Sequence, residues 1–381
     1  MKLFHLSDLH LGKSVHGFSM IEDQEYIIME ILDRVYQDKP NAILVSGDIF
    51  DRTIPSTEAL QLFDKFLMML VANSVKVYII SGNHDSADRL SFGAGLFNRS
   101  GVYFSRVYDR QLEPYVLEDK NTKINIYLLP FIKPAYVRRY FPDITIDTYT
   151  EAVDTVVSDM NINEQEINIL LAHQFVTGAS TSESEEHSVG GMDNVDGTVF
   201  GAFDYVALGH LHRPQHIARN TLRYSGSPLK YSFSEVNDIK SITALDITSK
   251  DLITIDTYPL VPKRDLLRLS GRYLELSARD FYSKLDTNAY YQIILTDEED
   301  QLDVFAKLRS IYPNLMTMEY SNMRTRVNSN VTRISVDHTK MDPIDIFSAL
   351  YIEQNGQPFS EVQREYLNKT IKEVFEEEEE L

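Results

Sequence analysis

Short apolar runs rich in β-branched residues alternate with longer amphipathic segments over the first 260 residues. The runs have the length of strands, and the segments between the early runs have the length and periodicity of helices. Strand-like runs occupy residues 2–6, 42–46, 75–80, 124–129, 167–172, 205–208, 241–247 and 252–259, and helical patterns occupy residues 22–37 and 56–73. This alternation predicts a layered α/β domain over residues 1–262.

The predicted helix at residues 56–73 is apolar on two sides. One side carries Leu60, Phe63, Leu67 and Leu70, and the other carries Leu62, Phe66 and Met69. Such a helix is either fully buried or places one of its sides in a subunit interface. From these residues alone we favour burial within the chain.

The pattern changes after Pro262. Residues 263–341 again alternate between strand and helix signals and predict a second, small α/β domain. Two short amphipathic helices are expected within residues 342–381, before a run of glutamates ends the chain. Two helices are too small to form a core, so we expect this terminal segment to dock on a partner protein.

Residues 177–196 separate two strand signals and are rich in glycine, serine and glutamate. We interpret them as a long loop. Loops of more than about 15 residues are often functional, but the residues do not say what this one does.

Composition narrows the classes of function. The chain has 381 residues, a formal net charge of −20 and no cysteine. Such an acidic chain is a poor candidate for wrapping nucleic acid by bulk electrostatics, although it can carry a local cationic site. Any metal must be held by oxygen and nitrogen ligands, because thiolates are absent. The chain has no signal-peptide pattern and no apolar run of about 20 residues, so we expect a soluble cytoplasmic protein without a membrane segment.

Metal-competent side chains follow five of the predicted strands. Ligands gather beyond the carboxyl ends of strands in α/β sheets, and residues two apart on a strand share a face. The candidate ligands are Asp8, His10, Asp48, Asn83, His173, His210 and His212. Seven ligands are too many for one tetrahedral ion and suit two ions that share a carboxylate. Four metal charges against two carboxylates leave a positive surplus that can hold a phosphate, so the pattern predicts a dinuclear phosphoesterase site.

Three neighbouring residues have candidate supporting roles. His84 adjoins Asn83 and can protonate a leaving oxygen or stabilise developing charge. A carboxylate is needed to orient such a histidine, and Asp51 is the best candidate. Asp85 has a plainer interpretation as the N-cap of the following helix. Each motif alone is commonly structural, but five of them in one order, with helix-sized gaps, favour a functional site.

The motifs resemble the signature of the calcineurin-like metallophosphoesterases. They read Asp8-X-His10, Gly47-Asp48-X-X-Asp51, Gly82-Asn83-His84-Asp85, His173 and Gly209-His210-X-His212. Their flanking residues are similar to those of the SbcD nuclease family, as is the segment from Tyr224 to Phe233. The resemblance is strong over residues 1–262. It extends to residues 263–381 in arrangement more than in motif.

This resemblance implies a four-layer αββα core, a capping domain at residues 263–341, and a terminal segment that docks on an SbcC-type ATPase. It implies a homodimer within a heterotetramer, formed through helices near the active site, which favours an interface side for residues 56–73. By resemblance, one Mn²⁺ is held by Asp8, His10, Asp48 and His212, and the other is held by Asp48, Asn83, His173 and His210. The resemblance also implies that His84 is the catalytic histidine. The implied activity is 3′–5′ exonuclease on duplex DNA and endonuclease on single strands and hairpins, gated by the ATPase. The chain departs from the family at Asp51, where archaeal and eukaryotic relatives tend to place a histidine.

The ligand chemistry alone does not choose among Mn²⁺, Fe and Zn²⁺.

Two other functions remain open from the residues. The first alternative is a metallophosphodiesterase that acts on a small or protein phosphoester, but this leaves residues 263–381 without a purpose. The second is a scaffold that has kept the fold and lost the metals, but here all seven ligand positions are filled.

Overall fold

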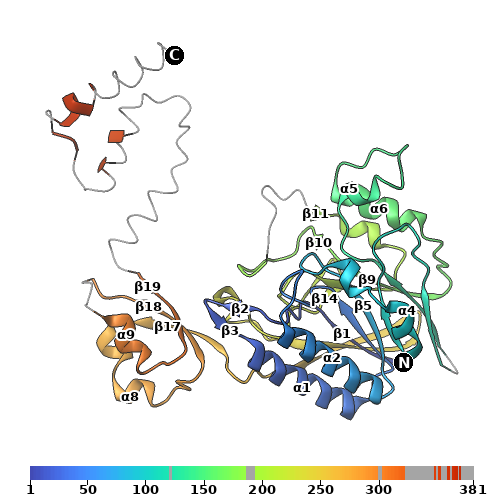
Figure 1. Cartoon of the computed structure of the whole chain (residues 1–381), viewed down its shortest axis with the longest axis horizontal. Helices are drawn as coiled ribbons and strands as arrows, with labels where there is room; N and C mark the ends of the chain where they lie inside the picture. Colours follow the sequence, from blue (N-terminus) through green and yellow to red (C-terminus); the bar gives the residue numbers. More distant parts are fainter. Residues whose placement is uncertain are drawn as a thin grey trace. The chain divides into compact units, whose positions relative to one another are not determined.

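The computed structural model describes residues 1–119, 122–185, 194–298 and 303–321, together with a few positions between 347 and 369 (Figure 1). The chain divides into two compact units. The first contains Met1–Arg268 together with Asn288–Gln292 and Asn314–Thr317, and the second contains the rest. No helix among the described residues is long and apolar enough to cross a membrane.

The first unit contains two six-stranded sheets. One has the order β16-β15-β1-β4-β5-β6, in which β1 (Lys2–Leu6), β4 (Ala42–Ser46), β5 (Lys76–Ile80) and β6 (Val102–Phe104) are parallel. The antiparallel strands β15 (Ser241–Ser249) and β16 (Leu252–Pro259) complete it. The other sheet has the order β13-β14-β12-β9-β8-β7. Its strands are β7 (Tyr115–Glu118), β8 (Lys123–Leu128), β9 (Ile167–His173), β12 (Tyr205–Gly209), β13 (Gln215–Ile217) and β14 (Arg219–Tyr224).

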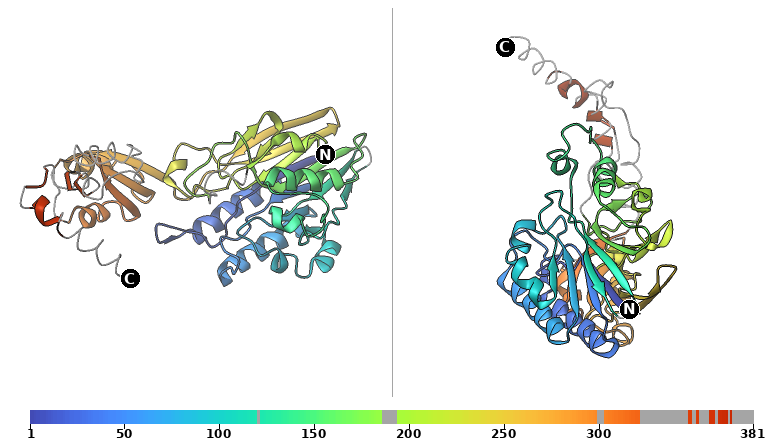
Figure 2. Two further views of the ribbon diagram at one scale, coloured as in Figure 1. Left: turned by 90° about the horizontal axis from the view of Figure 1, so that it is seen from above. Right: turned by 90° about the vertical axis from the view of Figure 1, so that its right-hand side faces the viewer.

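Alternation along each strand assigns its side chains to different layers. Phe4 of β1 packs with Ile31 of α1 (Ile21–Asp38) and Phe66 of α2 (Thr57–Ala72). Its neighbour Leu3 points the other way and joins a core with Ile169 between the two sheets. The helices α5 (Pro134–Val137) and α6 (Tyr149–Asp159) pack on the outer face of the second sheet. Figure 2 shows helices on both sides of the paired sheets, so the predicted αββα core is confirmed.

The helix α2 differs from the favoured expectation of complete burial. Leu62, Phe63 and Phe66 are buried in the core, but Leu60 is 49% exposed and Met68 is 64% exposed. Phe63, Leu67 and Leu70 of one predicted apolar side are buried, as are Leu62 and Phe66 of the other. Burial therefore holds for most of the helix, and the side left exposed among the described residues carries Leu60 and Met68. The exposed side faces a groove described below.

A three-stranded sheet follows the first 262 residues. It is formed by β17 (Leu266–Gly271), β18 (Tyr290–Leu295) and β19 (Leu315–Tyr320), within the segment for which alternating strands and helices were expected. The helices α7 (Tyr273–Leu276), α8 (Arg279–Tyr282) and α9 (Val304–Arg309) lie between these strands in the chain. Residues 322–346, and most of the two helices expected within 342–381, lie outside the described residues.

Candidate metal centre

The candidate ligands come from the carboxyl ends of strands in both sheets. Asp8 follows β1, Asp48 follows β4 and Asn83 follows β5, all in the first sheet. His173 ends β9, and His210 follows β12 in the second sheet. The two sheets pack face to face, so these strand ends meet at one place, as the sequence predicted.

Several of these residues have a backbone conformation that side chains rarely adopt. The φ angles are 53° at Asp8, 44° at His10, 49° at Asp48 and 104° at His210. Positive φ is costly for any residue other than glycine. The turns are held by backbone hydrogen bonds: the Asp8 amide donates to the Gly47 carbonyl at 3.1 Å, and the His10 amide donates to the Asp48 carbonyl at 2.9 Å.

Glycine is required where the two sheets approach each other at the site. A Cβ added to Gly209 would lie 1.8 Å from the carbonyl oxygen of Ser46, and one added to Gly47 would lie 2.4 Å from Nδ1 of His173. Gly47 also has φ +86°. Glycine therefore allows the close backbone approach that these contacts require.

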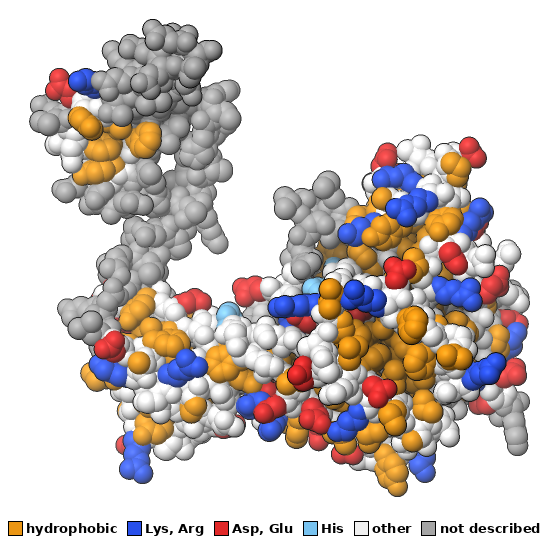
Figure 3. All heavy atoms as spheres, viewed as in Figure 1, with side chains coloured by type: hydrophobic (Ala, Val, Ile, Leu, Met, Phe, Trp, Pro, Cys, Tyr) orange, Lys and Arg blue, Asp and Glu red, His pale blue; other side chains and the backbone are white. Residues whose placement is uncertain are grey.

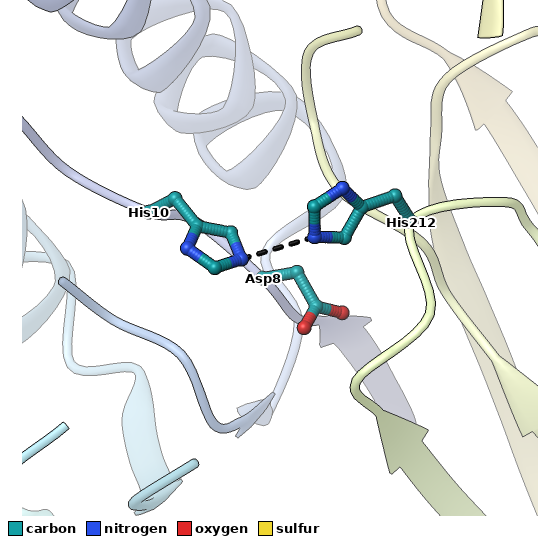
Figure 4. Close-up of side chains that lie close together, drawn as sticks. All are labelled: Asp8, His10 and His212. Carbon is teal, nitrogen blue, oxygen red and sulfur yellow. Dashed lines mark hydrogen bonds between the residues drawn. The ribbon is translucent and has the colours of Figure 1, made fainter. Parts of the chain in front are cut away.

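The donor atoms converge closely. Asp48 Oδ2 lies 3.6 Å from His10 Nε2 and 3.4 Å from His173 Nε2. The Nε2 atoms of His10 and His212 face each other at 3.0 Å beside the carboxylate of Asp8 (Figure 4). On the other side, Asn83 Oδ1 lies 3.0 Å from His173 Nε2 and 3.0 Å from His210 Nδ1. The structure therefore brings all seven candidate ligands together around Asp48.

The donor set fits divalent cations. Three groups of residues each offer donor atoms within 4.8 Å of one another. They are Asp8 with His10 and His212, Asp8 with Asp48 and His173, and His10 with Asp48 and His84. Asp8 Oδ2 and His10 Nδ1 are buried without a hydrogen-bond partner among the described residues. Unsatisfied buried polar atoms are costly, and a cation would satisfy the carboxylate oxygen. Nitrogen and carboxylate donors without thiolate suit Mn²⁺, Fe or Zn²⁺.

The electrostatics agree with a site built for positive charge. In the metal-free chain burial raises the pKa of Asp8 to about 6, because water no longer stabilises its charge. Burial lowers the pKa of His210 to about 3, which keeps this imidazole neutral, as a metal ligand must be. Burial also opposes protonation of His173, but the charge of Asp48 outweighs it and raises the His173 pKa to about 9.

His84 lies at the rim of the site and is half-buried. Its Nε2 is 4.0 Å from Asp48 Oδ2, and its ring packs edge-on against that of His10 at 4.8 Å between centroids. Its Nδ1 lies 3.0 Å from the backbone carbonyl oxygen of Asp51. The carboxylate of Asp51, which was expected to make this contact, instead accepts a bond from Lys13 Nζ at 2.7 Å.

Asp85 has a different role from the helix capping considered from the sequence. Its carboxylate accepts hydrogen bonds from the amides of Ile49 at 3.1 Å, Phe50 at 3.0 Å and Gly82 at 3.0 Å. It does not cap the following helix α3 (Ala87–Leu90) through its side chain, since the N-cap position is Ser86. Asp85 thus ties the Gly47–Asp51 turn to the Gly82–His84 turn.

The loop that follows β9 supplies a second set of residues that sequence reasoning missed. Ser184 Oγ lies 2.6 Å from His212 Nδ1, and the Ser184 hydroxyl donates to Glu235 Oε1 at 2.5 Å. Glu185 accepts a bond from the His212 amide at 2.6 Å. Glu235 is fully buried and pairs with Lys240 at 2.6 Å. The sequence could not predict this contact, because Ser184 and Glu235 are 51 positions apart.

The fold and this cluster of donors define a metal-dependent phosphoesterase, and sequence comparison narrows the class. Residues 1–214 match the family described as calcineurin-like phosphoesterase, and residues 262–355 match the SbcD_C family, described as type 5 capsule protein repressor C-terminal domain. The chain is 32% identical over 375 residues to the SbcD subunit of the nuclease SbcCD from Staphylococcus epidermidis (strain ATCC 12228 / FDA PCI 1200), covering 97% of this chain and 98% of that one.

The chain therefore belongs to the SbcD family within the calcineurin-like metallophosphoesterases. Solved structures similar to it include a dimetal phosphatase from Danio rerio, with TM-score 0.42 and 11% identity over 68% of this chain and 96% of that one. Another is the protein TT1561 of Thermus thermophilus, with TM-score 0.39 and 10% identity over 68% and 98%. The resemblance to the SbcD family inferred from the motifs is confirmed, and the chain is a metal-dependent phosphodiesterase.

Proposed function

We propose that this chain is the nuclease subunit of an SbcCD-type complex and cleaves DNA at the centre around Asp48. The proposed activities are 3′–5′ exonuclease on duplex ends and endonuclease on single strands and hairpins, gated by an SbcC-type ATPase, in DNA repair and recombination. The observation that carries the proposal is the convergence of seven oxygen and nitrogen donors in a chain similar along its whole length to an SbcCD nuclease subunit.

In this proposal two divalent ions, Mn²⁺ by preference, share the carboxylate of Asp48. Asp8, His10 and His212 complete one ligand set, and Asn83, His173 and His210 complete the other. The ions, when bound, supply positive charge to a phosphoryl group and acidity to nearby water. The chain orients its own ligands: the Nδ1–H of His173 donates a hydrogen bond to the Ser46 carbonyl at 2.8 Å, which leaves Nε2 to face the centre.

His84 is the proposed catalytic histidine. Its Nδ1–H donates to the Asp51 carbonyl, so its Nε2 is directed toward the centre beside Asp48. From this position a protonated ring can stabilise charge on a phosphoryl oxygen or donate a proton to the leaving oxygen. In this arrangement Asp51 orients His84 through its backbone, and its carboxylate fixes Lys13.

A homodimer is proposed through the exposed side of α2. This side borders a groove of about 800 Å³ lined by apolar side chains that include Ile54, Leu60, Met68 and Phe92. Figure 3 shows a continuous cluster of hydrophobic side chains in this area of the first unit. Apolar patches of this kind mark protein interfaces in soluble proteins. We further propose that residues 263–341 cap the DNA and that residues 342–381 dock on the ATPase.

The decisive experiment incubates the full chain, with its ATPase partner and Mn²⁺, with linear duplex DNA and with bis-p-nitrophenyl phosphate. We expect both substrates to be cleaved. His84→Ala should abolish DNA cleavage while two ions per chain remain bound, as measured by elemental analysis. Hydrolysis of the small ester with intact DNA would instead support an enzyme for small or protein phosphoesters. Deletion of residues 342–381 should release the partner and retain ester hydrolysis, and retained partner binding would refute the docking assignment.

A further inference from the structure

We propose that a cleft beside the metal centre binds a single-stranded segment of the nucleic acid next to the bond that is cut. The cleft has a volume of about 580 Å³, and its lining includes Gly82, the proposed ligand Asn83 and several side chains between Pro130 and Tyr140. It therefore borders the proposed metal centre. This inference rests on the proposed nuclease function and names how its substrate is held.

The walls of the cleft are cationic in a strongly acidic chain. Arg89, Lys133 and Arg139 all line it and all are exposed. Lys133 and Arg139 have no carboxylate partner among the described residues, and the only exposed carboxylate in this lining is that of Asp88. The chain as a whole carries −20. Figure 3 shows Lys and Arg side chains around α5. A local cationic surface in such an acidic chain can attract a polyanion.

Aromatic rings interleave with these cations. Phe131, Tyr136 and Tyr140 line the cleft, and Tyr136 is 42% exposed. Lys133 Nζ lies 5.8 Å from the Phe131 ring centre, and the Arg139 guanidinium lies 6.0 Å from that of Tyr136. Exposed rings beside cations form the platform on which unpaired bases stack while their phosphates meet the charges.

Phe131 connects the cleft to the proposed ligands. Its ring lies edge-on to that of His173, with 6.2 Å between centroids, and its amide donates to the Ser81 carbonyl at 2.9 Å. A base stacked near Phe131 would therefore belong to a nucleotide close to the centre. A cleft of this volume is the size of a small-ligand site and admits a nucleotide or two, whereas a base-paired duplex is too wide to enter it. The favoured occupant is consequently one strand, separated from its complement near the cut.

The test measures binding to the full chain in EDTA, where metal-dependent cleavage is stopped. The probes are a fluorescein-labelled oligothymidylate and a blunt duplex of the same length, followed by fluorescence anisotropy. The double variant Lys133→Gln with Arg139→Gln should weaken oligothymidylate binding by at least about ten-fold. It should also reduce the slope of log affinity against log salt concentration by the equivalent of roughly one to two phosphate contacts. Arg138→Gln is the matched control, because Arg138 is exposed next to Arg139 but bonds to the Ile146 carbonyl and does not line the cleft.

The aromatic part is tested separately. Tyr136→Leu should weaken oligothymidylate binding by about five-fold or more, and Tyr136→Phe should bind within about two-fold of the parent, because the ring is what stacks on the base. The proposal is overturned if the double variant loses no more affinity than Arg138→Gln, if it loses duplex and single-strand affinity equally, or if Tyr136→Leu binds normally. Failure of the nuclease function is distinguishable, because the unsubstituted chain would then hydrolyse bis-p-nitrophenyl phosphate and leave DNA intact.

Discussion

The ion pair between Glu235 and Lys240 offers a sharp test of how the centre is supported. Glu235 is fully buried and Lys240 is 4% exposed. The pair is 2.6 Å apart, and Lys240 also donates to the His212 carbonyl at 2.7 Å. Burial raises the Glu235 pKa, but the Lys240 and His212 contacts outweigh it and hold that pKa well below its usual range.

Glu235→Gln keeps the shape of the side chain and removes its charge. Removal of one partner from a buried pair costs about 3–5 kcal/mol, because the other charge stays buried without compensation. We expect about 3 kcal/mol, at the lower end of that range, since Lys240 keeps two neutral acceptors, the His212 carbonyl and Ser227 Oγ. Lys240→Met should cost a similar amount. The double variant should cost less than either single change, because no charge then remains buried.

The assay is urea unfolding of the metal-free chain by far-UV circular dichroism, with the free energy of unfolding extrapolated to water. The four proteins form a double-mutant cycle that isolates the pair. Additive losses, or a loss below about 1 kcal/mol for Glu235→Gln, would show that the two charges are not coupled in a buried site.

The same network should also tune metal affinity. In the relay, His212 Nδ1–H donates to Ser184 Oγ and the Ser184 hydroxyl donates to Glu235, which leaves Nε2 of His212 for an ion. Loss of such an outer partner typically reduces metal affinity by about 10–100-fold. Ser184→Ala should therefore weaken one of two Mn²⁺ sites in calorimetric titration. Thr181→Ala, an exposed change in the same loop, is the control. Equal weakening by both changes would contradict the relay.

Three further predictions concern the turns and charges of the centre. Asp85→Ala leaves the Ile49, Phe50 and Gly82 amides without their acceptor and should cost at least about 3 kcal/mol in urea unfolding, more than Asp85→Asn, which keeps an oxygen. Gly209→Ala should prevent normal folding, as judged by circular dichroism, because the added Cβ would lie 1.8 Å from the Ser46 carbonyl oxygen. The control Gly95→Ala should fold normally, because an added Cβ there has nothing within 4 Å. Burial raises the pKa of Asp8 and that of Asp85 to about 6 in the metal-free chain. The stability that their protonated forms contribute is therefore complete below about pH 4, and it is lost as the pH rises through about 6. Metal charge offsets this loss, so Mn²⁺ should raise the melting temperature more at about pH 7.5 than at about pH 5, and a shift independent of pH would refute the assignment.

Local patterns in the sequence were enough to predict the layers and the ligand positions. The alternation that places Leu3 and Phe4 in different cores is visible in the five residues of β1. The strand-end motifs are equally short, so both the αββα core and the meeting of the seven donors could be predicted. The expectation for α2 was incomplete, because periodicity shows that a helix has two apolar sides but not which neighbours cover them.

The supporting contacts could not be predicted because they join distant segments or use backbone atoms. His173 Nδ1 meets the carbonyl of Ser46, 127 positions away, and no side-chain pattern identifies a carbonyl acceptor. Asp51 contacts His84 by the same kind of atom, a backbone carbonyl, whereas the sequence pointed to its carboxylate. Ser184 and Glu235 meet although 51 positions separate them in the sequence.

The backbone of the centre gives an argument for function that is independent of resemblance. Ten described non-glycine residues have positive φ, and four of them are the proposed ligands Asp8, His10, Asp48 and His210. Left-handed backbone costs roughly 1–2 kcal/mol for each residue, so these turns together cost several kcal/mol that glycine would largely avoid. The same residues bury charged and imidazole groups, two of which leave a polar atom without a partner in the described chain. The strain is retained because the donor atoms must point to one place, and a cation there would satisfy the unpaired oxygen of Asp8.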